Sequence, residues 1–287
     1  MNPAVGAKPN GLAPEQSDWQ VPAYTVREFR PKGSRYAVAI FVLNEGDRIL
    51  TQLRSMEELA QTTDVVLADG GSTDGTMTER TIEPLGVRTL LTKTGPGKLS
   101  AQMRMAFAYV LEQDYRGVVT IDGNNKDDPR AIPAFFAELD SGVDHLQGSR
   151  FLPGGRAINT PLARMWAIRL IHAPLISFAA GFRYTDTTNG FRAYSRRLLL
   201  DPRVAPFRDV FSHYELHYYL AIRAAQLGFR VKELPVTRVY PDKGPTPTKI
   251  EPLKGNLVIL RTLLAACLHR FDPAPPPSST EVRSPSE

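Results

Sequence analysis

The regular alternation of short apolar runs with amphipathic segments constrains the fold of this chain more than any other feature of its sequence. Four runs have the length of strands, at residues 36–43, 64–68, 87–91 and 117–121, and the first two are apolar as expected of strands buried on both faces. Segments whose apolar side chains recur at helical spacing follow them, at residues 48–61, 76–83, 99–113 and 132–139. This order predicts an α/β fold with a mostly parallel sheet flanked by helices.

Polar and acidic residues follow three of the four predicted strands. The segments are NEGD from residue 44, DGGSTDG from residue 69 and DGNNKDDP from residue 122. Any one of them would suit an ordinary turn or helix cap. Parallel sheets, however, bind ligands at the carboxyl ends of their strands, where carboxylates can hold a nucleoside or a divalent cation. Three such segments at one sheet edge therefore predict a nucleotide site.

The second half of the chain is less regular. We expect a helix over 160–180 with a break near Pro174, strands at 190–194 and 231–236, and a helix over 212–227 that ends at Gly228. The predicted organisation is one α/β domain with flexible termini. Its parts are an extended arm at 1–34, the domain at 35–250, a C-terminal helix at 251–271 and a disordered tail at 272–287, which lacks apolar periodicity.

The charge of the chain favours anionic partners. The formal net charge is +5, which suits nucleotides, phosphorylated lipids or an anionic membrane surface. The basic residues are scattered, with neither an aromatic-interleaved RNA motif nor zinc-finger spacing, so we expect no nucleic-acid partner.

The sequence also predicts where the protein works. A single cysteine, Cys267, fits a reducing compartment. The apolar runs 173–182 and 257–268 are shorter than the ~20 residues of a membrane-spanning helix. We therefore expect a cytoplasmic protein that can lie peripherally on the inner face of the plasma membrane. The basic, apolar stretch 254–270 and the helix that carries Arg164 and Arg169 are the candidate contacts.

Seven segments, in order, carry a resemblance to a known family. VAIFVLNEGDRI, VVLADGGSTDGT, GKLSAQMRMAFAYV and VVTIDGNNKDDP resemble the family 2 glycosyltransferases of GT-A (Rossmann-like) fold. QGSRFLPGG, DTTNGFRAYSRRLL and LGFRVKELPV with KGPTPTKI resemble the branch that contains dolichyl-phosphate mannose synthase and bacterial polyprenyl-phosphate glycosyltransferases. The match spans about 36–250. It implies transfer of a sugar from a nucleotide-diphosphate donor of UDP or GDP type to a polyprenyl phosphate or another cell-envelope glycan or lipid precursor.

The resemblance also implies roles on the donor side. Glu45 and Asp69 would hold the nucleoside, with Asp69 on the base, and Asp74 would help to shape the same turn. Lys98 would lie near the donor pocket. Asp122 and Asn124 occupy the two acidic positions of the family's Asp-X-Asp motif, which binds a divalent cation and the diphosphate.

On the acceptor side, the resemblance places Arg150 where it would meet a phosphate. Asp186 and Arg192 flank the Asn189-Gly190 turn near the reacting centre. Lys249 matches a basic residue that closes over phosphate groups.

The second position of the Asp-X-Asp motif departs from the family pattern. Asn124 replaces the second Asp, and Lys126 stands where relatives often have Gln. An amide is a neutral oxygen ligand, so the site loses one negative charge. Lys126 can offset diphosphate charge in place of part of the metal. Dependence on Mg²⁺ or Mn²⁺ is therefore an open question at this point.

The reaction expected is a single displacement with inversion at the anomeric carbon. An alcohol acceptor needs a general base, for which Asp186 and then Glu215 are the candidates. A phosphate acceptor is already an anion and needs none. Two alternatives are a nucleotide-sugar-binding protein with weak or lost catalysis, suggested by Asn124, and a nucleotidyltransferase. The latter would carry a Gly-rich phosphate loop after the first strand, where this chain has NEGD.

Overall fold

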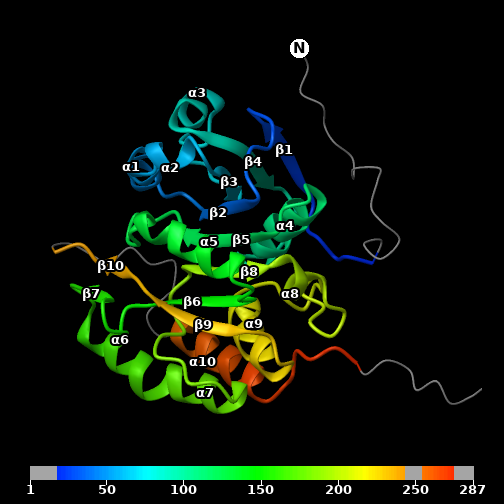
Figure 1. The fold of residues 1–287 in the computed structure, drawn as a ribbon, viewed down its shortest axis with the longest axis vertical. Coiled ribbons are helices and arrows are strands. Elements are labelled where there is room, and N and C mark those ends of the chain that lie inside the picture. The colour runs from blue at the N-terminus through cyan, green and yellow to red at the C-terminus, as the bar shows by residue number, and fades with distance from the viewer. Residues whose placement is uncertain (1–17, 243–253, 275–287) are drawn as a thin grey trace, which may run out of the picture.

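A computed structural model describes residues 18–242 and 254–274, which form an eight-stranded sheet with helices on both faces (Figure 1). The strand order is β1-β4-β3-β2-β5-β8-β6-β9. The four predicted strands are present and parallel: β2 (Tyr36–Val42), β3 (Asp64–Asp69), β4 (Val87–Lys93) and β5 (Gly117–Asp122). The prediction of an α/β fold with a mostly parallel sheet is confirmed.

One reversed strand determines which loops meet at the sheet edge. β8 (Arg192–Ser195) runs antiparallel to its two neighbours, β5 and β6 (His145–Ser149). β9 (Val231–Pro235) is parallel to β6. The start of β8 therefore lies at the same edge as the carboxyl ends of β5, β6 and β9. This arrangement brings the loop before Arg192 against the end of β5.

The sheet separates two apolar cores because successive strand side chains point to opposite faces. In β2, Ala37, Ala39 and Phe41 face α4 (Leu99–Glu112). Val38 and Ile40 instead pack with α1 (Asp47–Ser55) and α5 (Ile132–Asp140).

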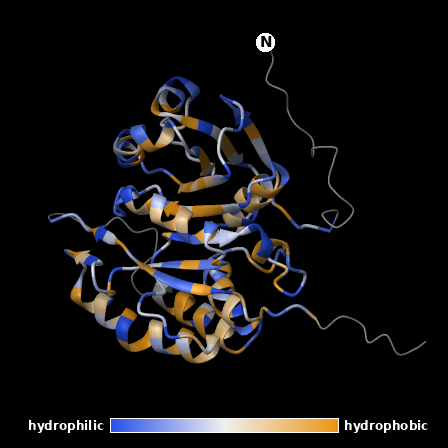
Figure 2. Cartoon of the chain, in the orientation of Figure 1, coloured by the Kyte–Doolittle hydropathy of each residue, from blue (hydrophilic) through white to orange (hydrophobic). Residues whose placement is uncertain are grey.

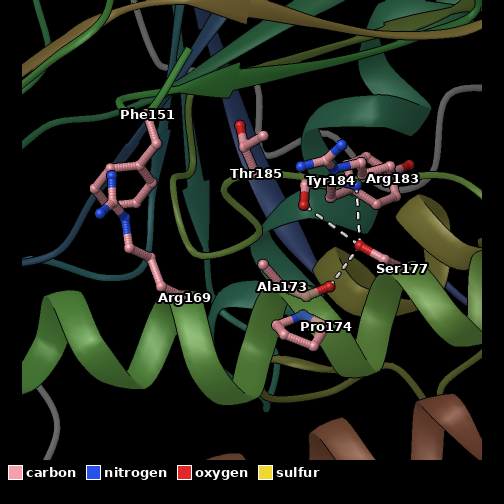
Figure 3. A pocket seen from close by; sticks show the side chains of 8 residues that line it. All are labelled: Phe151, Arg169, Ala173, Pro174, Ser177, Arg183, Tyr184 and Thr185. Carbon is pink, nitrogen blue, oxygen red and sulfur yellow. Dashed lines mark hydrogen bonds between the residues drawn. The ribbon is translucent and has the colours of Figure 1, made fainter.

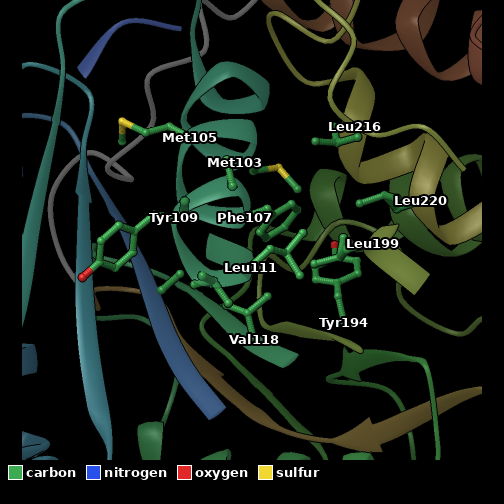
Figure 4. Close-up of a cluster of buried hydrophobic side chains, with 14 of the residues drawn as sticks. Met103, Met105, Phe107, Tyr109, Leu111, Val118, Tyr194, Leu199, Leu216 and Leu220 are labelled. Carbon is green, nitrogen blue, oxygen red and sulfur yellow. The ribbon is translucent and has the colours of Figure 1, made fainter. Parts of the chain in front are cut away.

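The core beneath α4 joins segments that are far apart in the sequence. Figure 4 shows Met103, Phe107 and Leu111 of α4 lying against Leu216 and Leu220 of α9 (Glu215–Gln226). α4 and α9 thereby hold the two halves of the sheet together.

Several helices differ from the sequence expectation at their ends. The segment 48–61 divides at Met56 into α1 and α2 (Glu57–Ala60). The segment 76–83 forms only α3 (Glu79–Ile82), followed by the 3-10 turn η2 (Glu83–Leu85). Pro84 lies inside that turn and has no N–H to continue an α-helix.

The predicted break near Pro174 takes the form of a π-helical turn. α6 (Leu162–Ala167) passes through the π segment η4 (Ile168–His172) into α7 (Ala173–Ala180). A proline cannot donate to the carbonyl four residues earlier, and a wider turn accommodates that loss.

Sequence analysis missed the shorter elements. These are β1 (Tyr24–Glu28), β6, β7 (Arg156–Ile158), β10 (Thr237–Val239) and the 3-10 turn η3 (Pro129–Ala131). The short helix α8 (Arg196–Leu200) follows β8 directly. β7 and β10 pair with each other outside the main sheet.

The described part of the predicted arm is extended, but it is not detached from the domain. β1 pairs antiparallel with β4 and forms the edge of the sheet. Trp19 stacks on Phe207 with their ring centroids 3.9 Å apart. At the other end, α10 (Lys254–Cys267) agrees with the predicted C-terminal helix. Among the described residues, none of the helices combines the length and apolarity that crossing a bilayer requires.

Candidate active site

Two polar loops at the sheet edge are hydrogen-bonded into one unit, here called the cradle (residues 44–46 and 69–76). The amide of Asn44 donates to Ser72 Oγ at 2.9 Å, and the amide of Thr73 donates to Asn44 Oδ1 at 2.7 Å. The amide of Gly46 donates to Asp74 Oδ2 at 2.9 Å. Burial raises the pKa of Asp74, but hydrogen bonds from Thr76 and Gly46 outweigh it and lower the pKa. Asp74 thus links the two loops of the cradle, and its role toward a donor stays a prediction.

Asp69 and Glu45 occupy the cradle with their carboxylates oriented by neighbours. Asp69 is buried and accepts hydrogen bonds from the amide of Ser72 at 2.9 Å and from its hydroxyl at 2.6 Å. Glu45 pairs with Arg48 at 2.8 Å. The two acidic groups assigned to the nucleoside therefore lie one in each loop of the cradle, and neighbouring side chains or amides orient both carboxylates.

Gln102 of α4 fixes the strand ends beneath the cradle, and sequence analysis missed it. Its Nε2 donates to the carbonyls of Val42 and Ala68, at 2.9 and 3.1 Å. A Cβ on Gly70 would lie 2.9 Å from that nitrogen, so a larger residue there would push the Gln102 amide out of this position. Lys98, at the start of α4, is exposed.

Asp122 ends β5 and lies beside a buried arginine that sequence analysis also missed. Arg238 Nη2 is 3.1 Å from Asp122 Oδ2, and its Nη1 contacts Asp127 and, at 3.1 Å, Asn189 Oδ1. β10 carries Arg238 to this position because it crosses the loop after β5. The amide of Val239 donates to the Lys126 carbonyl at 2.7 Å, and that of Asp128 donates to the Thr237 carbonyl at 3.1 Å.

The charges in this group shift the pKa values in opposite directions. Burial raises the pKa of Asp122, but the attraction of Arg238 outweighs it and holds the pKa below the ordinary value. Burial also raises the pKa of Asp127, and because the charge of Arg238 offsets only part of that effect, the pKa of Asp127 stays above its ordinary value. The Asp122 side chain keeps 25 % of its surface exposed. It is thus the charged carboxylate of the pair that a ligand can reach.

Asn124 presents an oxygen suited to a cation. Its Nδ2 donates to Asp122 Oδ2 at 3.4 Å. Its Oδ1 is buried and has no hydrogen-bond partner among the described residues. A buried polar atom in that state is costly unless a ligand satisfies it. The two residues assigned to the metal therefore lie side by side and offer a carboxylate and an amide oxygen.

Lys126 is buried in a cluster of cations around Tyr240. Its Nζ lies 5.1 Å from the centre of the Tyr240 ring, and Arg164 donates to the Tyr240 hydroxyl at 3.2 Å. Burial, with help from the charge of Arg238, lowers the pKa of Lys126. Burial raises the pKa of Tyr240, but the neighbouring arginines outweigh it and lower the pKa. Positive charge is thus concentrated beside the Asp122–Asn124 pair.

Arg150 and Asp186 form a buried two-point ion pair. Arg150 Nε lies 2.6 Å from Asp186 Oδ2, and Nη2 lies 2.9 Å from Oδ1. Their side chains are 1 % and 0 % exposed. Burial raises the pKa of Asp186, but the charge of Arg150 outweighs it and lowers the pKa. The sequence predicted that Arg150 contacts a phosphate and that Asp186 acts as a base. In the structure, the two side chains neutralise each other's charge. Their catalytic roles remain predictions.

Arg192 lies inside the protein, beside the Asn189-Gly190 turn, and its role toward a donor stays a prediction. Its guanidinium donates to the carbonyls of Asn189 at 2.9 Å, His217 at 2.5 Å and Thr187 at 2.7 Å. The residue is 1 % exposed. It holds the turn before β8 in shape, which places Gly190 against Asp122. A Cβ on Gly190 would lie 2.5 Å from Asp122 Oδ1.

Two candidate residues remain, Glu215 and Lys249. Glu215 begins α9, and its Oε2 accepts a hydrogen bond from the amide of His213 at 2.6 Å. The structure thus gives Glu215 a place at the start of a helix. Lys249 lies outside the described residues.

Comparison with known proteins finds relatives that match most of the chain. The chain is 29% identical over 217 residues to an undecaprenyl-phosphate mannosyltransferase of Micrococcus luteus, a match covering 73% of this chain and 86% of the relative. It is 26% identical to a polyprenol monophosphomannose synthase of Mycolicibacterium smegmatis, covering 71% of this chain and 77% of the relative.

These relatives support the resemblance to the family 2 glycosyltransferases of the polyprenyl-phosphate branch. The named relatives and structural neighbours are glycosyltransferases, which supports the prediction of a glycosyltransferase. No family model matches the sequence. A glucosyl-3-phosphoglycerate synthase of Mycobacterium tuberculosis, solved with Mn²⁺, UDP and phosphoglyceric acid, superimposes with a TM-score of 0.59. It is 19% identical, with 85% of each chain covered, and the likeness confirms the GT-A fold.

The buried ion pair predicts a large effect on stability. Asp186→Asn should lower the free energy of unfolding by about 3–5 kcal/mol, because it leaves the Arg150 charge buried without its counter-charge. Asp140→Asn is the matched control, since its pair with Arg35 is exposed and should be worth under ~1 kcal/mol. Urea unfolding measures both. Equal, small losses would contradict a structural role for the Arg150–Asp186 pair.

Proposed function

We propose that the chain transfers a sugar, with inversion, from a nucleoside-diphosphate sugar of UDP or GDP type to a polyprenyl phosphate. The observation that carries the proposal is the meeting, at one sheet edge, of the cradle, the Asp122–Asn124 pair and the Gly190 turn. The named relatives, which act on undecaprenyl phosphate and polyprenol, support the acceptor class. Work on such an acceptor takes place at a membrane surface.

The donor would lie across the cradle and the end of β5. Asp69 and Glu45 would accept hydrogen bonds from the base and the ribose, and Asp69 is already oriented for this by Ser72. The diphosphate would then reach Asp122, with Lys98 and Lys126 as the cations assigned to it. The structural neighbour solved with UDP supports a nucleoside-diphosphate donor.

The residues at the end of β5 fit a divalent cation. A charged carboxylate on Asp122 and a buried amide oxygen on Asn124 are ligands that Mg²⁺ and Mn²⁺ accept. No cluster of three or more His, Cys, Asp or Glu able to hold a metal occurs among the described residues. Donor phosphates would therefore complete the coordination. When bound, the cation would neutralise charge on the leaving diphosphate.

A phosphate acceptor suits this site better than an alcohol. An alcohol needs a base, and both oxygens of Asp186 already accept hydrogen bonds from Arg150. A phosphate monoester is itself the nucleophile. In this proposal Arg150 and Asp186 act as positioning residues that fix the loops around the acceptor.

The charged carboxylate of Asp122 should be essential for transfer. Asp122→Asn keeps the volume of the side chain and should lower turnover about 10²–10³-fold, the loss typical of a removed electrostatic contact to the reacting centre. The assay follows labelled sugar from donor to polyprenyl phosphate, with thermal unfolding as a check on the fold. Asp128→Asn, in the same loop but paired with exposed Arg130, should change turnover little. Near-normal activity in Asp122→Asn would move the metal and diphosphate site elsewhere.

Asn124 and Lys126 should set the response to metal. Asn124→Asp restores a carboxylate and should lower the half-saturating Mg²⁺ concentration about tenfold, equivalent to ~1.4 kcal/mol. Lys126→Ala removes a cation beside the diphosphate and should make activity depend more strongly on added Mg²⁺ or Mn²⁺. Lys126→Arg keeps the charge and should behave like the wild type. Identical metal curves for wild type and Lys126→Ala would rule out charge compensation by Lys126.

A further inference from the structure

Large apolar side chains are exposed on two helical segments that are far apart in the sequence. In the segment from α6 to α7, Phe178 is 91 % exposed and Leu170 is 67 % exposed. In the segment formed by α10 and the turn after it, Leu268 is 65 % exposed. The full set, here called the apolar face, comprises Leu162, Trp166, Leu170, Ile171, Phe178, Leu257, Val258, Leu260, Leu264 and Leu268.

The two segments are neighbours in space. α10 buries Leu263 and Ala266 against Ile176 and Ala180 of α7. Its exposed leucines recur every three or four residues along the opposite side, so the helix is apolar both inward and outward. Figure 1 places α6, α7 and α10 at the end of the molecule remote from α3, and Figure 2 shows them coloured as largely hydrophobic.

The charged residues within the two segments that carry the apolar face are basic. The sequence contains no Asp or Glu from His145 to Thr185, and none from Pro252 to Phe271. Arg169, Arg183, Arg261 and Arg270 are exposed in these stretches. Each basic residue near an anionic bilayer contributes about 1 kcal/mol of attraction. Apolar side chains surrounded by arginine match the interface between acyl chains and anionic headgroups.

A pocket lies between the helical segment that carries part of the apolar face and the two loops that carry Arg150 and Asp186. It measures about 410 Å³ and is lined on one side by Arg169, Pro174 and Ser177 of η4 and α7. On the other side are Phe151 and Thr185, the chain neighbours of Arg150 and Asp186. Figure 3 shows Arg169 beside the ring of Phe151, 4.7 Å from its centre. A bilayer on the apolar face would therefore lie next to the acceptor side of the site.

We propose that the apolar face docks on an anionic lipid bilayer, with its leucines, Trp166 and Phe178 entering the headgroup region. The proposal rests on the proposed function, because a polyprenyl phosphate is held in such a bilayer. A second copy of the chain is a poorer occupant. A two-fold dimer through this face would set arginine-bearing stretches that lack acidic residues against each other.

Trp166 provides a probe within the face itself. The chain has two tryptophans, and Trp19→Phe leaves Trp166 as the reporter while it keeps an aromatic ring on Phe207. Its emission should shift to shorter wavelength with vesicles of phosphatidylcholine and phosphatidylglycerol in equal parts. The shift should be much smaller with phosphatidylcholine alone, and high salt should reverse it. An emission that neither vesicle changes would overturn the proposal.

Vesicle sedimentation with matched variants tests the residues. Phe178→Ser and Leu268→Ser, one from each helical segment, should each lower vesicle affinity about tenfold through lost apolar burial. Arg261→Gln should weaken binding to the anionic vesicles only. Val210→Ser removes an equally apolar side chain outside the face and should change nothing. Docking through this face would be contradicted if Phe178→Ser and Leu268→Ser bound vesicles as well as Val210→Ser does. It would also be contradicted if the wild-type chain bound no vesicles and these two substitutions instead abolished its self-association.

A transfer assay with detergent-dispersed polyprenyl phosphate separates this proposal from the proposed function. Transfer in detergent without vesicle binding would overturn the docking face and leave the function intact. Vesicle binding without transfer would support the face and count against the function.

Discussion

The guanidinium of Arg238 is the group on which the candidate site depends. It contacts Asp122, Asp127 and Asn189, and so joins the loop after β5 to the turn before β8. Two carboxylates this close to each other and to the protein interior would otherwise raise each other's pKa. With Arg238 between them, Asp122 remains charged where a ligand can reach it. The site is therefore arranged before any donor binds.

This arrangement gives a physical meaning to the departure at Asn124. A second carboxylate there would attract a cation strongly even without donor. With an amide in its place, and with Arg238 and Lys126 nearby, the negative charge that attracts a cation must come largely from the diphosphate. Cation and donor would then bind together. In the account proposed here, the substitution changes the order and strength of metal binding rather than removing catalysis.

Periodicity predicted the first half of the sheet because buried parallel strands such as β2 and β3 are continuously apolar. It also predicted that Glu45, Asp69, Asp74, Asp122 and Asn124 follow strand ends, and carboxyl ends of parallel strands meet at one edge. Sequence reasoning could not find β6, whose segment His145–Ser149 is buried yet contains polar residues. It also could not pair Arg150 with Asp186, or Arg238 with Asp122, because β8 and β10 create both contacts over long sequence separations.

The identity of the released nucleotide tests the central claim most directly. The purified chain would be incubated with UDP- and GDP-sugars, Mg²⁺ or Mn²⁺ and undecaprenyl phosphate, and the products separated by mass spectrometry. Glycosyl transfer predicts a nucleoside diphosphate and a polyprenyl-phosphate sugar in equal amounts, the sugar with inverted anomeric configuration. A nucleoside monophosphate or pyrophosphate among the products, or donor that stays intact with every acceptor offered, would contradict the account.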